Sequence, residues 1–505
     1  MIDSNERIDT SSGSAAKVDR DEVFVEFTRS VCPVCRRVID AEVNIRRGGV
    51  YLRKRCPEHG EFEALTCSDA AWYLDSLRLN KPGTIPHEFA TEVAQGCPSD
   101  CGLCPAHKQH TCLALIEINS NCNLDCPLCF AESGHHPDGF SLSVDQVRFM
   151  LARFVEAEGD PEAVQLSGGE PTIHPDILAM VDACRDAGIR YVMVNTNGVR
   201  LARDPGFAGE LAARGAHVYL QFDGFHASTH LALRGRDLRR EKERALEQCD
   251  AAGVSVTLVA AVERGVNDDE VGDIVRFGVR HPAVNSVVFQ PVTNAGRHRP
   301  FDPLTRLTNP DVMRMIADQV PEWFRRRDFV PVPCCFPTCR SITYALVDGD
   351  TVVPLPRLLD VESHLDYVAN RMLPDPAVLG ALERLWSASS VPGSDTQVES
   401  LECATCGIDL PGALRDLRQR VFTLVIQDFQ DPYTLNVRQL MKCCVAELTP
   451  DGRQIPFCAY NSVGYRERVR AALTRGGAEL AVPNARPLAA DLRPGRHGSM
   501  IWGRP

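Results

Sequence analysis

The sequence predicts an α/β fold, a partial parallel (β/α)6 barrel with a cysteine-rich metal-binding region on each side. Between about residues 113 and 300, short apolar runs alternate with amphipathic helical patterns, as in a series of βα units. Polar or glycine-rich motifs follow several of these apolar runs. The chain also contains 21 cysteines, many of them in the spacings of metal ligands.

Six apolar runs are predicted to be the strands of the barrel. They have the length and aliphatic character of buried parallel strands and comprise Leu113–Ile118, Ala163–Ser167, Tyr191–Val194, Val218–Phe222, Val254–Ala260 and Ser286–Gln290. Helical patterns separate them, and the first helix begins with a capping box formed by Ser143 and Gln146. Cys184 and Cys249 fall on apolar helix faces, so we interpret both as core residues rather than metal ligands.

The loop after the first strand contains Asn121–Phe130, NCNLDCPLCF, in which Cys122, Cys126 and Cys129 form a CxxxCxxC triad. Three thiolates can hold three irons of a cubane iron–sulfur cluster and leave the fourth iron open to another ligand. The alternative is a zinc knuckle with a fourth ligand elsewhere, but zinc pairs usually have the shorter CxxC spacing. We therefore predict that this loop holds the reactive metal site.

Three more motifs occur at predicted strand ends: GGEPT (Gly168–Thr172), NTNG (Asn195–Gly198) and QFDGF (Gln221–Phe225). Parallel α/β barrels bind their ligands at the carboxyl ends of the strands. The three motifs and the cysteine triad are therefore expected to meet at one rim of the barrel.

The triad motif and GGEPT together resemble those of the radical S-adenosylmethionine (radical SAM) superfamily, so the expected barrel is a radical SAM barrel. The resemblance implies that SAM chelates the open iron of a 4Fe-4S cluster and is cleaved to methionine and a 5′-deoxyadenosyl radical. It implies catalytic roles for Cys122, Cys126 and Cys129, and SAM or substrate contacts for Gly168, Gly169, Glu170, Asn195, Asn197, Gln221, Asp223 and Arg234. Glu170 is expected to receive the SAM ammonium, and Arg234 either pairs with the methionyl carboxylate or is a solvated surface residue.

Residues 21–95 are predicted to form a zinc-ribbon or rubredoxin-like module. CPVC and CPEHG supply four ligands for one zinc or iron ion, namely Cys32, Cys35, Cys56 and His59. Cys67 competes with His59 for the fourth position. Because every ligand position would be filled, the expected role is structural or electron-relaying.

Two further cysteine groups are predicted to bind auxiliary 4Fe-4S clusters. The segment 96–112, directly before the barrel (113–300), provides Cys97, Cys101, Cys104 and Cys112. The C-terminal auxiliary domain, 301–475, provides a set in which we favour Cys335, Cys339, Cys444 and Cys458 over Cys334 and Cys443. A hairpin turn at 450–452 brings residues 443 and 444 beside Cys458. Participation of Cys403 and Cys406 stays open, and a structural zinc is the alternative to this cluster.

The composition is that of a globular protein, 44% hydrophobic and 24% charged, with a net charge of −12 that argues against nucleic-acid binding. The sequence shows neither a secretory signal nor an apolar run long enough to span a bilayer. We therefore expect a cytoplasmic protein that contacts the inner membrane face at most peripherally. Residues 1–20 and 476–505 are predicted to be mobile tails, and Ser387–Ser400 a linker.

Four motifs, CPEHG, CGLCPAHKQHTC, CNLDCPLCFAESG and PFCAYN, together resemble the tetraether lipid synthase group of radical SAM proteins, which has relatives described as dihydropterin methyltransferases. The resemblance implies carbon–carbon bond formation at an unactivated C–H of an apolar, lipid-like substrate, with an electron donor such as flavodoxin or ferredoxin. A second hypothesis is a radical SAM methyltransferase acting on a pterin or similar heterocycle. A third is a non-enzymatic multi-metal redox protein or scaffold.

Overall fold

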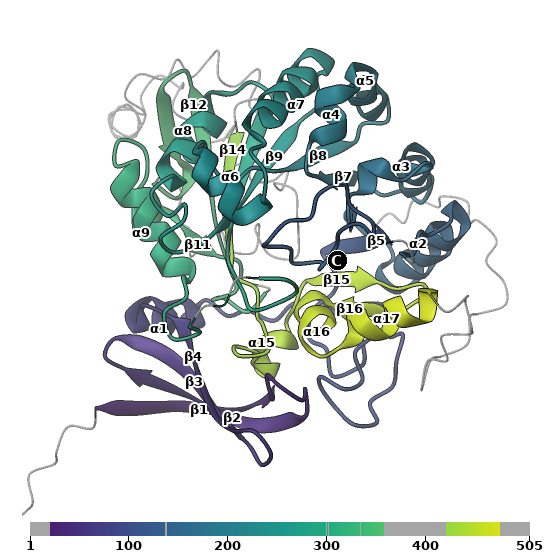
Figure 1. Ribbon diagram of the computed structural model, residues 1–505. Helices are drawn as coiled ribbons and strands as arrows, with labels where there is room; N and C mark the ends of the chain where they lie inside the picture. The colour runs from purple at the N-terminus through teal and green to yellow at the C-terminus, as the bar shows by residue number, and fades with distance from the viewer. Residues whose placement is uncertain are drawn as a thin grey trace, which may run out of the picture.

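The computed structural model describes residues 21–136, 139–298, 300, 302–333, 335–357 and 421–474. These residues form a four-stranded antiparallel sheet and a twelve-stranded mixed sheet. The small sheet lies below the large one in Figure 1, where helices cover the outer face of the large sheet. The predicted tails, the linker Ser387–Ser400, and Cys334, Cys403 and Cys406 lie outside the described residues.

The small sheet is the predicted N-terminal metal-binding module. Its strands pair in chain order as antiparallel neighbours and are β1 (Glu22–Val31), β2 (Val38–Arg46), β3 (Gly49–Cys56) and β4 (Gly60–Cys67). Helix α1 (Ala70–Arg78) follows and packs Tyr73 into an apolar cluster with Val43 and Val50. Alternating burial along β2 and β3 gives the sheet one covered face, as expected of an antiparallel sheet.

Six consecutive parallel strands form the centre of the large sheet, as predicted. They are β5 (Leu113–Asn119), β6 (Ala163–Gly168), β7 (Tyr191–Thr196), β8 (His217–Gln221), β9 (Val256–Val262) and β10 (Val284–Pro291). The helices between them are α2 (Val144–Glu158), α3 (Ile177–Asp186), α4 (Val199–Arg203), α5 (Pro205–Ala213), α6 (Ala227–Arg234), α7 (Arg239–Ala252) and α8 (Val271–Arg280), with a 3-10 turn η1 at Pro171–Ile173. The capping box of Ser143 and Gln146 is present, and Cys184 and Cys249 lie in the apolar core.

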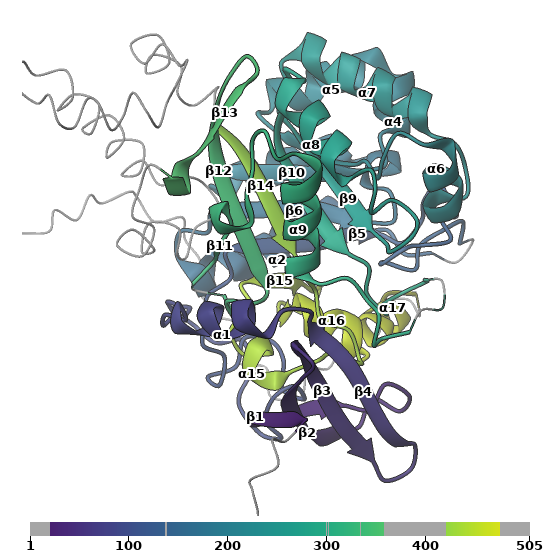
Figure 2. The same ribbon diagram turned by 90° about the vertical axis from the view of Figure 1, so that its left-hand side faces the viewer.

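Strands from the C-terminal third extend both edges of this parallel sheet. On one side β14 (Val421–Gln427) runs parallel to β10 and is followed outward by β12 (Arg340–Asp348), which pairs with β11 (Val330–Pro331) and β13 (Thr351–Pro354). On the other side β15 (Val445–Leu448) runs parallel to β5 and forms a hairpin with β16 (Gln454–Pro456). Figure 2 shows β12 and β14 beside β10. Residues expected in a flanking domain thus build both side walls of the barrel, where they cover apolar edges.

Helices of the C-terminal third complete the fold. They are α9 (Asn309–Gln319), α15 (Val437–Leu440), α16 (Phe457–Ser462) and α17 (Tyr465–Thr474), with 3-10 turns η2 (Arg326–Asp328) and η3 (Leu355–Arg357). The segment around α15 also holds the small sheet in place, since buried Lys54 donates to Pro432 O at 2.6 Å and Thr28 donates to Asn436 at 2.8 Å. Within the described ranges, none of the helices has both the length and the apolar character needed to cross a membrane.

Candidate active site at the rim of the barrel

The three cysteines of the triad lie on the loop after β5, and all three line one cavity of about 880 Å³ inside the barrel. Backbone hydrogen bonds fix this loop: Cys122 N–H donates to Gly134 O at 2.9 Å, and Cys129 exchanges two bonds with Arg297 at 2.7 and 3.0 Å. Burial raises the pKa of the Cys122 thiol to about 12. The metal-free thiol is therefore protonated, and metal binding must displace its proton.

Four arginines donate side-chain hydrogen bonds to carbonyl groups of the same loop. Their acceptors are Leu128 O for Arg234, Cys126 O for Arg297, Phe130 O for Arg466 and Ala131 O for Arg470, at 3.1, 2.7, 2.9 and 2.8 Å. Each guanidinium also pairs with a carboxylate, so the loop is anchored without a large excess of positive charge. Sequence reasoning missed the last three, because only the fold brings them to the loop.

The glycines of the GGE motif are required by the packing of β6 against the triad loop. Gly168 has φ +124°, and a Cβ there would lie 2.2 Å from Asn119 O. A Cβ on Gly169 would lie 2.0 Å from Asn121 O. The backbone N–H groups of Gly169 and Glu170 donate to these same two carbonyls, both at 2.9 Å. Any side chain would push the two strand ends apart.

The Glu170 carboxylate is buried and joins two strand ends. Its Oε1 accepts from the Thr172 N–H at 3.1 Å and the Thr196 hydroxyl at 2.7 Å, while Oε2 accepts from the Asn197 N–H at 2.7 Å. Burial raises the pKa of Glu170, and these hydrogen bonds oppose the rise. Glu170 lines the cavity and its Oε2 retains acceptor capacity. A contact with an ammonium group therefore stays a prediction that this geometry permits.

Arg234 is paired within the protein. Its side chain is 12% exposed, lines the cavity and forms two 2.7 Å hydrogen bonds with Asp223, which is fully buried. A buried carboxylate such as Asp223 needs a paired cation, and this need explains the placement. Arg234 is therefore not a solvated surface residue, and its contact with the methionyl carboxylate stays a prediction.

Lys242 connects the remaining polar groups of the rim. Its Nζ donates to Asn197 O at 2.6 Å and to Gln221 Oε1 at 2.8 Å, and Gln221 donates in turn to Asp223. Asn195 lies beside them and donates to Ser167 at 3.3 Å. Burial lowers the pKa of Lys242 to about 7. Sequence reasoning missed Lys242, although it shares a helical face with Ala245, Leu246 and Cys249, where a lysine is out of place.

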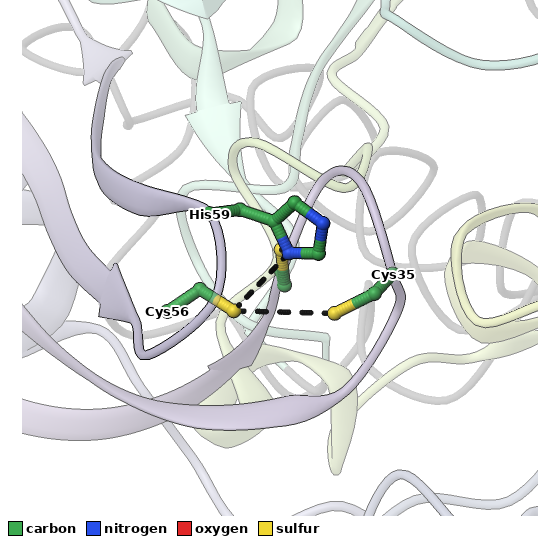
Figure 3. A group of neighbouring side chains, drawn as sticks. Cys35, Cys56 and His59 are labelled. Atoms are coloured by element: carbon green, nitrogen blue, oxygen red, sulfur yellow. Dashed lines mark hydrogen bonds between the residues drawn. The ribbon is translucent and has the colours of Figure 1, made fainter.

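The N-terminal module brings Cys32, Cys35, Cys56 and His59 together, with all four ligand atoms within 4.8 Å of one another. In Figure 3 the labelled side chains point toward a common centre, and the Cys56 sulfur lies 3.5 Å from His59 Nδ1. Cys67 is not part of this group, because its thiol donates to Asp69 O and packs in the apolar cluster of the sheet. The four donors fit a single ion such as zinc.

The segment 96–112 is divided by the fold. Cys97, Cys101 and Cys104 line one small pocket with Met441. Cys112 does not join them, since its N–H donates to Cys444 O at 2.9 Å and its side chain packs with Cys335 and Cys444. The reason is its position directly before β5, which pairs with β15.

In the C-terminal region one pocket is lined by five cysteines: Cys335, Cys339, Cys443, Cys444 and Cys458. Four of them are the favoured set, and the predicted hairpin brings Cys443 to the same place. A disulfide joins Cys335 and Cys444. The hydrogen bond with Cys458 lowers the pKa of Cys443 to about 7. Cys443 is thus a fifth candidate ligand, which sequence reasoning ranked lower.

Comparisons with known proteins agree with this architecture. Residues 116–278 match the radical SAM superfamily, and residues 24–68 match the HMPTM N-terminal zinc ribbon domain. The chain is 33% identical over 481 residues to 7,8-dihydro-6-hydroxymethylpterin dimethyltransferase of Methanocaldococcus jannaschii, covering 87% of this chain and 94% of that protein. This extent decides the family. The chain belongs to the radical SAM superfamily.

Other similarities cover smaller parts of the chain. GTP 3′,8-cyclase 3 of Mycobacterium bovis is 29% identical over 171 residues, covering 32% of this chain and 44% of that protein. A solved structure of Streptococcus suis SuiB bound to S-adenosylmethionine has 16% identity and a TM-score of 0.35 over 42% of this chain and 48% of that chain.

Membership in the superfamily settles the general class of the protein. This radical SAM enzyme requires a 4Fe-4S cluster and SAM, and the zinc ribbon indicates a further metal such as zinc. The hypothesis of a non-enzymatic scaffold is therefore wrong. Between the two enzymatic hypotheses, the named relative agrees better with the pterin methyltransferase than with the lipid-coupling enzyme.

Proposed function

We propose that this radical SAM enzyme transfers a methyl group to a pterin or a similar heterocycle. The observation that carries the proposal is the match to the archaeal dimethyltransferase, which extends over 94% of that protein. The match covers 87% of this chain, which is more than the barrel alone, and residues 24–68 separately match the zinc ribbon domain. A resemblance restricted to the barrel would have supported only the general chemistry.

The rim residues have separate tasks in this proposal. Cys122, Cys126 and Cys129 would hold the cluster, and their position on the cavity wall suits chemistry at an open iron. When bound, the cluster and SAM supply the 5′-deoxyadenosyl radical. Glu170 would orient the SAM ammonium through Oε2, and Lys242 would hold Asn197 and Gln221 in position through its two hydrogen bonds.

The remaining cysteine groups would hold auxiliary clusters that exchange electrons with the rim. In the five-cysteine pocket this requires the Cys335–Cys444 disulfide to be reduced first. The group of Cys97, Cys101 and Cys104 and the five-cysteine pocket lie next to the same C-terminal elements, since Leu440 lines both of their pockets. An electron donor such as flavodoxin or ferredoxin would supply the reducing electron. Free thiols in these numbers suit a reducing compartment such as the cytoplasm.

A second function, carbon–carbon coupling on an apolar chain, is favoured by the extent of the cavity. Its lining runs from the triad past Met193 and Val288 to Tyr191 and His217, near the opposite ends of β7 and β8. A pterin would fill only part of this space. An extended chain would use its full length.

Methyl-labelled SAM distinguishes these two functions. The protein is reconstituted anaerobically with iron, sulfide and a reductant, and then supplied with 7,8-dihydro-6-hydroxymethylpterin. Label in the pterin product is the expected result. Production of 5′-deoxyadenosine without labelled pterin, together with unlabelled coupling of a lipid extract, would support the second function instead. Absence of 5′-deoxyadenosine under these conditions would contradict both.

A further inference from the structure

An aromatic surface lines the cavity next to the triad loop. The rings of Phe130 and Phe457 are stacked with their centroids 5.0 Å apart, and the Phe429 ring lies 4.8 Å from that of Phe457. All three side chains line the cavity, and Phe130 directly follows Cys129 in the chain. Such a surface can hold a flat ring by stacking or edge-to-face contact.

A carboxyl group with an unused oxygen lines the same cavity. Glu447, on β15, has only 1% of its surface exposed, and its Oε1 accepts a hydrogen bond from the Glu117 N–H at 2.8 Å. Its Oε2 is buried and has no hydrogen-bond partner within the part of the chain that the structure describes. An unpaired buried polar atom is unfavourable, so a ligand that forms a hydrogen bond with Oε2 would be stabilised there.

Among the residues that the structure describes, no cation forms an ion pair with Glu447, although the charges of Arg466 and Arg470 act on it and oppose the rise of its pKa. Glu117 accepts hydrogen bonds from Arg466 at 2.8 Å, Arg470 at 3.1 Å and the Tyr460 hydroxyl at 3.0 Å. Burial and the neighbouring Glu117 carboxylate raise the pKa of Glu447 well above its usual range. A neutral carboxyl group can donate one hydrogen bond and accept another.

The carboxyl group and the aromatic surface belong to one wall of the cavity. Glu447 follows Val445 by two residues on β15, so both side chains lie on the same face of the strand. Val445 packs in one apolar cluster with Phe457, against which Phe130 and Phe429 also pack. One ligand could therefore contact the aromatic surface and form hydrogen bonds with Glu447 at the same time.

We propose that Glu447 and the surface of Phe130, Phe429 and Phe457 form the subsite for a flat heterocycle with a hydrogen-bond donor and acceptor on adjacent edge atoms. Glu447 pairs with that edge, and the phenyl rings contact the faces or the rim of the ring. The inference deepens the proposed function, because a pterin is a ring of this kind. An alkyl chain in the same place would leave Glu447 Oε2 unpaired.

The test measures binding of 7,8-dihydro-6-hydroxymethylpterin to the reconstituted full-length protein in the presence of SAM. Glu447→Leu is expected to raise the dissociation constant about tenfold, while Glu447→Gln, which keeps the hydrogen bonds, stays within about threefold of wild type. Phe457→Leu is expected to weaken binding about fivefold through lost aromatic contact. The matched control is Ser286→Ala, elsewhere on the cavity wall, with unchanged binding. SAM cleavage without substrate is also expected to be unchanged in Ser286→Ala.

Equal pterin affinity of wild type and Glu447→Leu would overturn the subsite. If Glu447→Leu does not fold, equal pterin affinity of wild type and Phe457→Leu would overturn the subsite instead. Pterin binding that depends on Glu447 without methyl transfer would support the subsite and contradict the proposed function. Failure of the wild-type protein to bind the pterin would overturn both.

Discussion

The N-terminal metal-ligand group and the cysteine triad differ in the number of ligands that the chain supplies and in what surrounds them. Cys32, Cys35, Cys56 and His59 offer four donors to one ion, on a small sheet with its own apolar cluster. The triad offers three donors and opens onto the large cavity. A closed donor set stabilises a fold, whereas a donor set with one vacancy can bind a reactant. The closed four-ligand site and the open three-ligand site therefore also differ in whether they border a cavity.

Replacing a triad cysteine should have the largest effect on activity. Cys126→Ser is expected to lower 5′-deoxyadenosine formation at least a hundredfold, because the cluster loses one of its three protein ligands. The four loop arginines do not depend on this thiol, so the variant should stay folded. Iron content, electron paramagnetic resonance of the reduced protein and circular dichroism measure these effects. A variant that cleaves SAM at the normal rate would contradict the open-site role.

The matching change in the closed site is Cys56→Ser. It is expected to remove one metal ion per chain and to lower the stability of the N-terminal module by more than about 3 kcal/mol, because metal binding contributes directly to folding. SAM cleavage should fall far less than in Cys126→Ser. Metal analysis and thermal unfolding measure the first effect. Loss of SAM cleavage equal to that of the triad variant would remove the distinction between the two sites.

Arg297→Met tests whether the open site needs its external anchoring. Arg297 donates to Cys126 O and Ser133 O, both at 2.7 Å, and charge-assisted bonds of this kind contribute about 1.5–3 kcal/mol each. SAM cleavage is expected to fall about tenfold, with an altered resonance spectrum of the reduced cluster. The control is Arg276→Met, which removes an exposed pair with Glu322 on the outer surface. Equal effects of both variants would contradict the anchoring role.

The smallest effect is expected at the far end of the cavity, where the tilted rings of His217 and Tyr191 lie with their centroids 4.1 Å apart. Burial lowers the pKa of His217 from 6.5 to about 4. The folded state therefore favours the neutral imidazole, and its stability is fully present above pH 6.5 and decreases as the pH falls toward 4. In His217→Gln, the free energy of unfolding should therefore depend less on pH over this range. Urea titrations at several pH values measure this dependence. An unchanged pH dependence would show that His217 does not titrate in this way.

Much of the fold follows from local patterns in the sequence. The six parallel strands were predictable because buried strands are continuous apolar runs, and the four ligands of the N-terminal group because their spacing suits two facing turns. The side walls were not predictable, since nothing in the sequence of Val421–Gln427 indicates that it pairs with β10. The separation of Cys112 from Cys97, Cys101 and Cys104 was not predictable for the same reason, because it follows from the pairing of β5 with β15.

The polar rim was predicted in part. Motifs at strand ends indicated that Glu170, Asn197, Gln221 and Asp223 converge, and the structure brings them together through shared hydrogen bonds. The pairing of Arg234 with Asp223 was not predicted. Pairing between two buried charges depends on tertiary distances, which residue spacing does not encode.

The position of the side-wall strands in the chain also affects the order in which the barrel can fold. β12, β14 and β15 leave the ribosome after all six central strands, yet they supply cavity-lining residues on both sides of the triad loop. Contacts such as Val445 with Leu113 join distant parts of the chain and form late. A nascent chain therefore presents the triad loop in a half-open sheet before its walls arrive. The triad thiols, which are partly exposed in the folded protein, are more accessible during that interval.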